Sequence, residues 1–162
     1  MTTTYLPAPL EVRELLEGLL GKGVTVGNSP PLIPTTANPA SIGIYVDDTL
    51  QIIGVAVADL AFSAYAAGAL SLTPMADITK VIERGILDEP TREALYEILN
   101  IGASMFNAPG ASHVKLHDLH PAGDRHPAHV QARALTLGKR LDLGVEISGY
   151  GPGRLSLVLI PG

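Results

Sequence analysis

The sequence predicts an α+β domain in which helices pack on a mostly antiparallel β-sheet. Two pairs of apolar stretches, within 41–57 and 143–160, are each joined by a short polar or glycine-rich turn, as in antiparallel hairpins. Between them, apolar residues recur at helical spacing over 58–70, 73–85 and 88–107. Runs of strands and runs of helices that segregate in this way are typical of the α+β class.

Composition and length indicate one folded domain, over 8–162, behind a flexible tail at 1–7. The chain has 162 residues, of which 46% are hydrophobic and 17% charged, enough to bury a core. Its net charge is −5 and its basic residues are scattered, so neither nucleic acid nor a membrane surface is an expected partner. The absence of cysteine fits a reducing compartment, and residues 1–14 do not resemble a signal peptide, so we expect a cytoplasmic protein.

The first part of the chain predicts a helix, a short strand, a loop and a hairpin. Leucines at 10, 15, 16, 19 and 20 recur at helical spacing ahead of Gly21, which ends the run. Four prolines make the next connection irregular. The expected elements are a helix over 9–20, a strand over 24–26, a loop over 27–39, and strands over 41–46 and 50–57 that turn at Asp47-Asp48-Thr49.

Residues 50–72 allow two interpretations. Only Asp59 is charged in this stretch, so its length and hydrophobicity alone would permit a membrane span. Gln51 and Ser63 also interrupt it, and β-branched residues give way to alanine midway. We therefore expect a buried strand that leads into a buried helix over 58–70.

The most informative stretch is 88–107, which follows a short helix expected over 73–85. Asp88 can cap a helix that begins there, and Pro90 is tolerated in its first turn. At about 100° per residue the apolar and polar positions separate onto two faces. The apolar face holds Leu95, Ile98, Leu99, Gly102 and Phe106, and the polar face holds Glu93, Glu97, Asn100 and Ser104.

The last part of the chain predicts strands. Residues 112–119 and 131–137 alternate apolar and polar side chains, and 120–129 is a polar loop with two prolines. Two further strands, over 143–148 and 155–160, flank the sequence GYGPGR. We expect the chain to end in a hairpin.

The spacing Glu97-Ile98-Leu99-Asn100, followed by Ile101-Gly102-Ala103, resembles the E-x-x-N signature of the CheX, CheC and FliY family of chemotaxis phosphatases. The order of expected elements also resembles the CheX-like fold over nearly the whole chain. Members hydrolyse the aspartyl phosphate on the response regulator CheY. The resemblance implies a hydrolase of two-component signalling that forms a homodimer. In the first helix Glu17 stands where a second signature would need Asn, so one site is expected.

The resemblance also assigns roles to the polar face. Asn100 would position the attacking water, because a carboxamide both accepts and donates hydrogen bonds without becoming charged. Glu97 would dock on a lysine of the CheY-like receiver domain. Glu93 and Ser104, on the same face, are expected to contact that partner. This chain is expected to bind no cofactor itself, while Mg²⁺ is expected on the phosphorylated partner.

Two residues depart from the family pattern. Glu93 stands where the family has Asp or Ser, and Gly123 stands where its trailing proline would fall. An alternative function follows from these departures, namely a catalytically inactive CheX-like module that acts as an interaction partner or adaptor.

The histidines suggest a third possibility, a metal-binding protein. All five, His113, His117, His120, His126 and His129, lie within seventeen residues. On a strand, His113 and His117 would share a face but stand about 13 Å apart, too far for one ion. A helix would bring them together. No G-x-S-x-G elbow and no phosphate-binding glycine loop occurs in the sequence.

Overall fold

The computed structural model describes residues 4–111 and 113–161, which form five α-helices, a short 3₁₀ helix and a six-stranded sheet. In chain order the elements are α1 (Pro9–Leu20), β1 (Val24–Asn28), β2 (Ala40–Val46), β3 (Ile52–Asp59), α2 (Leu60–Ser71), α3 (Met75–Arg84), α4 (Glu89–Gly102), η1 (Ala103–Phe106), β4 (Lys115–His120), α5 (Ala128–Ala134), β5 (Arg140–Ile147) and β6 (Gly151–Leu159).

The sheet confirms the predicted α+β class. Its strand order is β1-β5-β6-β3-β2-β4, and every neighbouring pair is antiparallel. Both predicted hairpins are present, β2–β3 and β5–β6, and they meet through the β3–β6 pair at the centre of the sheet. Among the described strands, β1 and β4 form the two edges.

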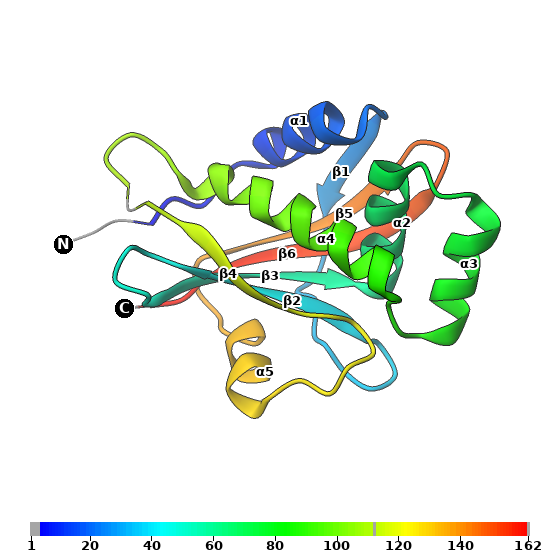
Figure 1. Ribbon diagram of the computed structural model, residues 1–162. Helices are drawn as coiled ribbons and strands as arrows, with labels where there is room; N and C mark the ends of the chain where they lie inside the picture. Colours follow the sequence, from blue (N-terminus) through cyan, green and yellow to red (C-terminus); the bar gives the residue numbers. More distant parts are fainter. Residues whose placement is uncertain (1–3, 112, 162) are drawn as a thin grey trace.

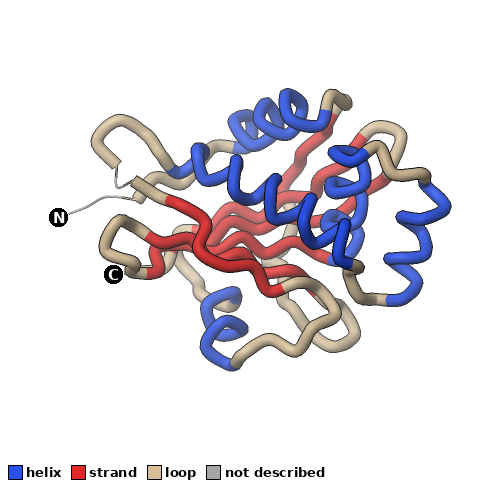
Figure 2. Tube along the Cα trace, viewed as in Figure 1, coloured by secondary structure: helices blue, strands red, loops and turns tan. Residues whose placement is uncertain are grey.

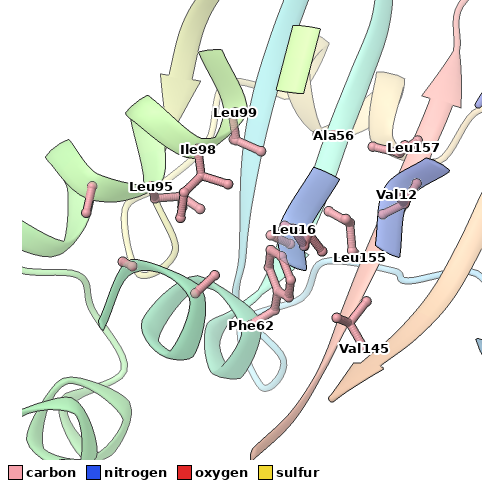
Figure 3. Close-up of a cluster of buried hydrophobic side chains, with 14 of the residues drawn as sticks. Val12, Leu16, Ala56, Phe62, Leu95, Ile98, Leu99, Val145, Leu155 and Leu157 are labelled. Carbon is pink, nitrogen blue, oxygen red and sulfur yellow. The ribbon is translucent and has the colours of Figure 1, made fainter. Parts of the chain in front are cut away.

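Helices cover the two faces of the sheet unequally. As Figure 1 shows, α1, α2 and α4 lie over one face, and α3 packs outside α2. On the opposite face, the described residues place the short α5 and the loop that precedes β2; Figure 2 shows the same arrangement by element type. A large core fills the first face (Figure 3), and a smaller one, to which Leu32, Val130 and Ala134 contribute, fills the second.

The buried helix α2 begins where the sequence supplies a cap. Asp59 ends β3, and its carboxylate accepts a hydrogen bond from the backbone N–H of Phe62 at 2.8 Å. The carboxylate also accepts from the N–H of Arg154 on β6, at 3.1 Å. Burial nevertheless raises the pKa of Asp59, against the lowering effect of these two bonds. One acidic residue thus closes the strand, starts the helix and ties both to a neighbouring strand.

The prediction of a strand over 131–137 was wrong, because this stretch forms most of α5. Val130 and Ala134 are both buried, and they are four residues apart, which is the spacing of a helix face. Pro127 precedes the helix and begins it. The alternation of short apolar and polar residues misled the prediction, since a seven-residue helix shows less than two turns of its period.

Smaller differences concern the chain ends and helix boundaries. Leu10 is exposed rather than part of the apolar face of α1, whose buried residues are Val12, Leu16 and Leu20. Residues 1–3 of the predicted tail lie outside the described residues, whereas Leu6 packs against the larger core and Pro7 is buried. Ser112, where a strand was expected to begin, also lies outside them, and β4 begins at Lys115.

In the described residues, no helix is both long enough and apolar enough to cross a membrane. The stretch 50–72 is instead split between β3 and α2, as the preferred interpretation predicted.

Candidate functional site

The helix α4 is fixed at its start by its own cap. Asp88 accepts a hydrogen bond from the backbone N–H of Thr91 at 3.0 Å. Hydrogen bonding by Thr91 is the largest effect on this carboxyl, and together with the charges of Arg84 and Arg92 it lowers the pKa of Asp88. The predicted start of the helix is confirmed, but the α-helix ends at Gly102, and 103–106 continue as the 3₁₀ helix η1.

The inner face of α4 lies directly on the sheet. Leu95, Ile98 and Leu99 point into the larger core (Figure 3). Helix and strand approach closely at Gly43 of β2, where a Cβ atom would stand 2.9 Å from the Cδ1 atom of Leu99. Glycine therefore lets α4 sit against β2 at the turn that precedes Asn100. The strand that α4 contacts here, β2, is hydrogen-bonded on both sides, to β3 and to β4.

The outer face of α4 carries the polar residues of the predicted site. Glu93, Glu97 and Asn100 are exposed, and so is Ser104 in η1, while all five predicted apolar positions are buried. Residues three apart on a helix have Cβ atoms about 5–6 Å apart, so Glu97 and Asn100 are neighbours on one open surface.

Neither Glu97 nor Asn100 makes a side-chain hydrogen bond, and Glu97 makes no ion pair, within the part of the chain that the structure describes. Their polar atoms are therefore free to meet water or a partner. Glu93 and Glu97 are like charges at i,i+4, a spacing that slightly destabilises a helix, so helix stability does not explain this face.

Two exposed apolar side chains border the polar pair, and the sequence analysis did not identify them. Tyr96 is 41% exposed and Ile101 is 40% exposed, each next in sequence to a residue of the E-x-x-N spacing. The sequence did contain a signal for them, because both are apolar residues that fall outside the apolar face of the helix. Tyrosine is enriched at protein interfaces, so Tyr96 is suited to meet a partner beside the polar pair.

A shallow groove of about 640 Å³ runs beside this face, between α4 and the edge strand β4. Glu93 and Tyr96 line it from α4, and His120 lines it from β4. The outer face of α4 is thus continuous with a concave surface rather than isolated on a ridge.

The position that departs from the family pattern, Gly123, has a structural role. It occupies the third position of a turn from Pro121 to Asp124, which is closed by a 3.2 Å hydrogen bond, and its φ is +94°. Proline requires a φ near −65°, so it cannot replace glycine in this turn. A Cβ atom on Gly123 would also stand 2.5 Å from the backbone oxygen of Gly85.

The same turn supports the entry into α4. The backbone N–H of Leu87, just before the cap residue, donates to the carbonyl of Ala122 at 3.3 Å. The N–H of Ala122 in turn donates to the Ser41 hydroxyl on β2 at 2.9 Å. In this chain the start of α4 is therefore fastened to the sheet through a glycine turn.

The histidines do not form a metal centre in 4–111 and 113–161, where no group of three or more potential ligands comes together. His113 contacts Asp48 at 3.2 Å, and His120 contacts Asp118 at 3.4 Å, in separate places. His126 contacts the carbonyl of Ala40 at 2.7 Å, so it ties the loop before α5 to β2.

No protein-family model matches the sequence, and no curated protein matches it either. Solved structures share its fold. A chain of the CheX–CheY–BeF3–Mg complex from Borrelia burgdorferi is similar with 12% identity and a TM-score of 0.55, covering 96% of this chain and 100% of its own. FliY from Thermotoga maritima has 14% identity and a TM-score of 0.57, over 90% of this chain and 80% of its own.

A chain of the FliM–SpeE complex from H. pylori is also similar, with 9% identity and a TM-score of 0.59, over 93% of this chain and 80% of its own. These likenesses confirm the predicted CheX-like architecture, which this chain shares with CheX and FliY. At such low identities they establish the fold, and the function has to be argued from the residues.

Proposed function

We propose that this chain is a cytoplasmic phosphatase that hydrolyses the aspartyl phosphate of a CheY-like receiver domain in chemotaxis. The observation that carries the proposal is the placement of Glu97 and Asn100. Within the described residues they are exposed and unpaired neighbours on the outer face of a helix whose inner face is anchored in the core. The fold found in the CheX–CheY complex supports the same assignment.

In the proposed reaction, the oxygen of a water molecule attacks phosphorus in line with the bond to the receiver's aspartate. A phosphorus–oxygen bond forms to water, the bond to the aspartate oxygen breaks, and inorganic phosphate leaves an aspartate carboxylate behind. The Asn100 carboxamide oxygen accepts a hydrogen bond from this water and holds it in place. The gain in rate comes from positioning, because phosphoryl transfer needs little covalent help from the protein.

Glu97 supplies the docking contact. Its carboxylate has no cationic partner within the described residues of this chain, so it is available for a lysine of the receiver. Glu93 and Ser104 contact the receiver on either side of the signature turn. Mg²⁺ belongs to the receiver in this proposal, where it neutralises charge on the phosphoryl group.

The deciding experiment follows phosphate release from a phosphorylated CheY-like receiver in the presence of Mg²⁺. Wild-type protein is expected to accelerate release above the receiver's own rate. Asn100→Ala is expected to lose about 100-fold of this acceleration while it still binds the beryllofluoride-loaded receiver. The matched control is Asn38→Ala, which removes an exposed carboxamide from the loop before β2. Equal turnover by wild type and Asn100→Ala would contradict the role of Asn100.

A second candidate is a module that binds a receiver without hydrolysing its phosphate. The similarity to a chain of the FliM–SpeE complex favours it, because the same architecture occurs there in an assembly other than a CheX–CheY complex. Glu93, in place of the family's Asp or Ser, favours it too. Stoichiometric binding of the loaded receiver with no change in its rate of phosphate loss would identify this function.

We also propose that the protein forms a homodimer. The strands at the two edges of the described sheet, β1 and β4, present backbone groups that a second copy could pair with. Sedimentation at micromolar concentration is expected to give twice the mass of one chain, and a single-chain mass would refute the dimer.

A further inference from the structure

Tyr45 lies on β2 directly beneath the end of α4. Its side chain is completely buried, and its hydroxyl donates a hydrogen bond of 2.6 Å to the backbone carbonyl of Leu99. Its ring packs against Phe106 of η1, with centroids 4.9 Å apart. Tyr45 therefore contacts both the residue that precedes Asn100 and the segment that follows it.

The carbonyl of Leu99 accepts this bond where the hydrogen-bonding pattern of the helix changes. In a regular α-helix it would accept from the backbone N–H of Ala103, four residues on. Here the helix tightens at its end, and that N–H bonds instead to the carbonyls of Asn100 and Ile101. A buried carbonyl without a donor is costly, and the Tyr45 hydroxyl supplies one.

The backbone of β2 is irregular at the same residue. The pairing of β2 with β3 shifts register between Tyr45 and Val46, and its pairing with β4 shifts between Ile44 and Tyr45. The side chains of β2 nevertheless keep their alternation, since Ile44 and Val46 lie in the smaller core and Tyr45 lies in the larger one, on the face that α4 covers.

The hydroxyl is also a dependable donor, because burial raises the pKa of Tyr45 well above its usual value. It therefore stays protonated around neutral pH.

We infer that Tyr45 is a positioning residue, which holds the last turn of α4 so that the Asn100 carboxamide is aimed at the attacking water. The inference rests on the proposed phosphatase function. Tyr45 does not touch the partner or the water, since it is buried on the opposite side of the helix. It acts through the Leu99 carbonyl, one peptide group away from Asn100.

The test compares Tyr45→Phe with Tyr65→Phe, which removes a hydroxyl from α2 that makes no hydrogen bond among the described residues. Tyr45→Phe is expected to lower turnover about tenfold and to change the affinity for the beryllofluoride-loaded receiver less than twofold. In an Asn100→Ala background it is expected to lower turnover no further, because the group it aims is gone. Unchanged turnover, or the same loss in both backgrounds, would overturn the inference.

A second measurement does not depend on activity. In wild-type protein the Tyr45 hydroxyl proton is expected to give a slowly exchanging NMR signal, and in Tyr45→Phe the amides of 100–106 are expected to exchange selectively faster. A rapidly exchanging hydroxyl, or uniformly faster exchange, would refute the anchoring even if Tyr45→Phe fails to accumulate. Wild-type protein that anchors α4 in this way but releases no phosphate would refute the phosphatase proposal instead.

Discussion

At the scale of single residues, the exposed acid and amide of α4 have separable effects. Glu97→Gln keeps the size and exposure of the side chain but removes its charge. We expect this change to weaken receiver binding about tenfold at low salt and less at high salt, because the lost contact is ionic. Titrations of the beryllofluoride-loaded receiver at two ionic strengths measure it.

The matched control for Glu97 is Glu83→Gln on α3, an exposed carboxylate away from the proposed site. Glu83→Gln and Glu97→Gln change the net charge by the same amount, so their comparison separates the effect of where the charge is lost from the effect of the net charge. An equal loss of affinity in both variants would show that only overall charge steers the receiver, and would contradict docking by Glu97.

The turn at Gly123 gives a prediction about stability. Gly123→Ala combines a positive φ with a Cβ atom 2.5 Å from the backbone of Gly85 and Ile86, so it should lower the free energy of unfolding by about 3 kcal/mol. Gly110→Ala has a similar φ of +81° but open space around its Cβ, and should lower it by about 1 kcal/mol. Urea denaturation separates the two, and equal losses would show that the close backbone contact is unimportant.

Sequence reasoning predicted that Glu97 and Asn100 share one face of a helix, because spacing within a helix fixes which side chains are neighbours. It predicted their exposure correctly, since the alternative face was continuously apolar. It could not identify Tyr45, whose partner Leu99 lies 54 residues away and offers a backbone carbonyl rather than a side chain. Contacts of this kind arise from the docking of a helix on a strand, and no local pattern encodes them.

At the scale of elements, the cap of α4 can be tested directly. Asp88→Ala removes the acceptor for the Thr91 N–H and should lower the free energy of unfolding by about 1 kcal/mol. Asp88→Asn keeps an acceptor and should lower it less. Thermal unfolding at neutral pH measures both, and an unchanged melting temperature for Asp88→Ala would contradict a role for the cap in holding α4.

The same residue predicts a pH dependence. The pKa of Asp88 is lowered in the folded protein, so the unfolded chain binds its proton more tightly. Its contribution is present above the unfolded pKa of about 3.9 and is lost as pH falls through the lower folded value. The stability difference between wild type and Asp88→Asn should therefore be constant above about pH 5 and shrink below pH 4. A difference that grows with acid would reverse the assigned sign.

Whether an element could be predicted depended on its length and on its own caps. The 14-residue α4 has a capping acid, an early proline and about four turns of apolar spacing, and all three features can be recognised in the sequence. The seven-residue α5 has none of these except Pro127, and its buried side chains are only Val130 and Ala134. Its helical state is decided by packing on the sheet, where the two residues fill the smaller core.

At the scale of the whole molecule, the sheet separates the proposed site from a second core. The helices that carry and support Glu97 and Asn100 lie on one face, and α5 and the loop before β2 lie on the other. The two cores are separated by the strands of the sheet. A change in the packing of one core therefore affects the other core through the strands. This architecture occurs in a chain of a FliM–SpeE complex and in a chain of a CheX–CheY complex, so the fold alone does not decide the chemistry.

This separation predicts that stability and turnover can be changed independently. Val130 is almost completely buried on the face opposite α4, so Val130→Ala should lower the free energy of unfolding by about 2 kcal/mol. Leu137→Ala, nearby in sequence but at a side chain that is 77% exposed, should change it by less than about 0.5 kcal/mol. Under conditions where each variant is folded, both should release phosphate from the receiver at the wild-type rate. A loss of turnover in folded Val130→Ala, without one in Leu137→Ala, would show that the sheet transmits packing changes to α4, and the proposed site would then have to include the second core.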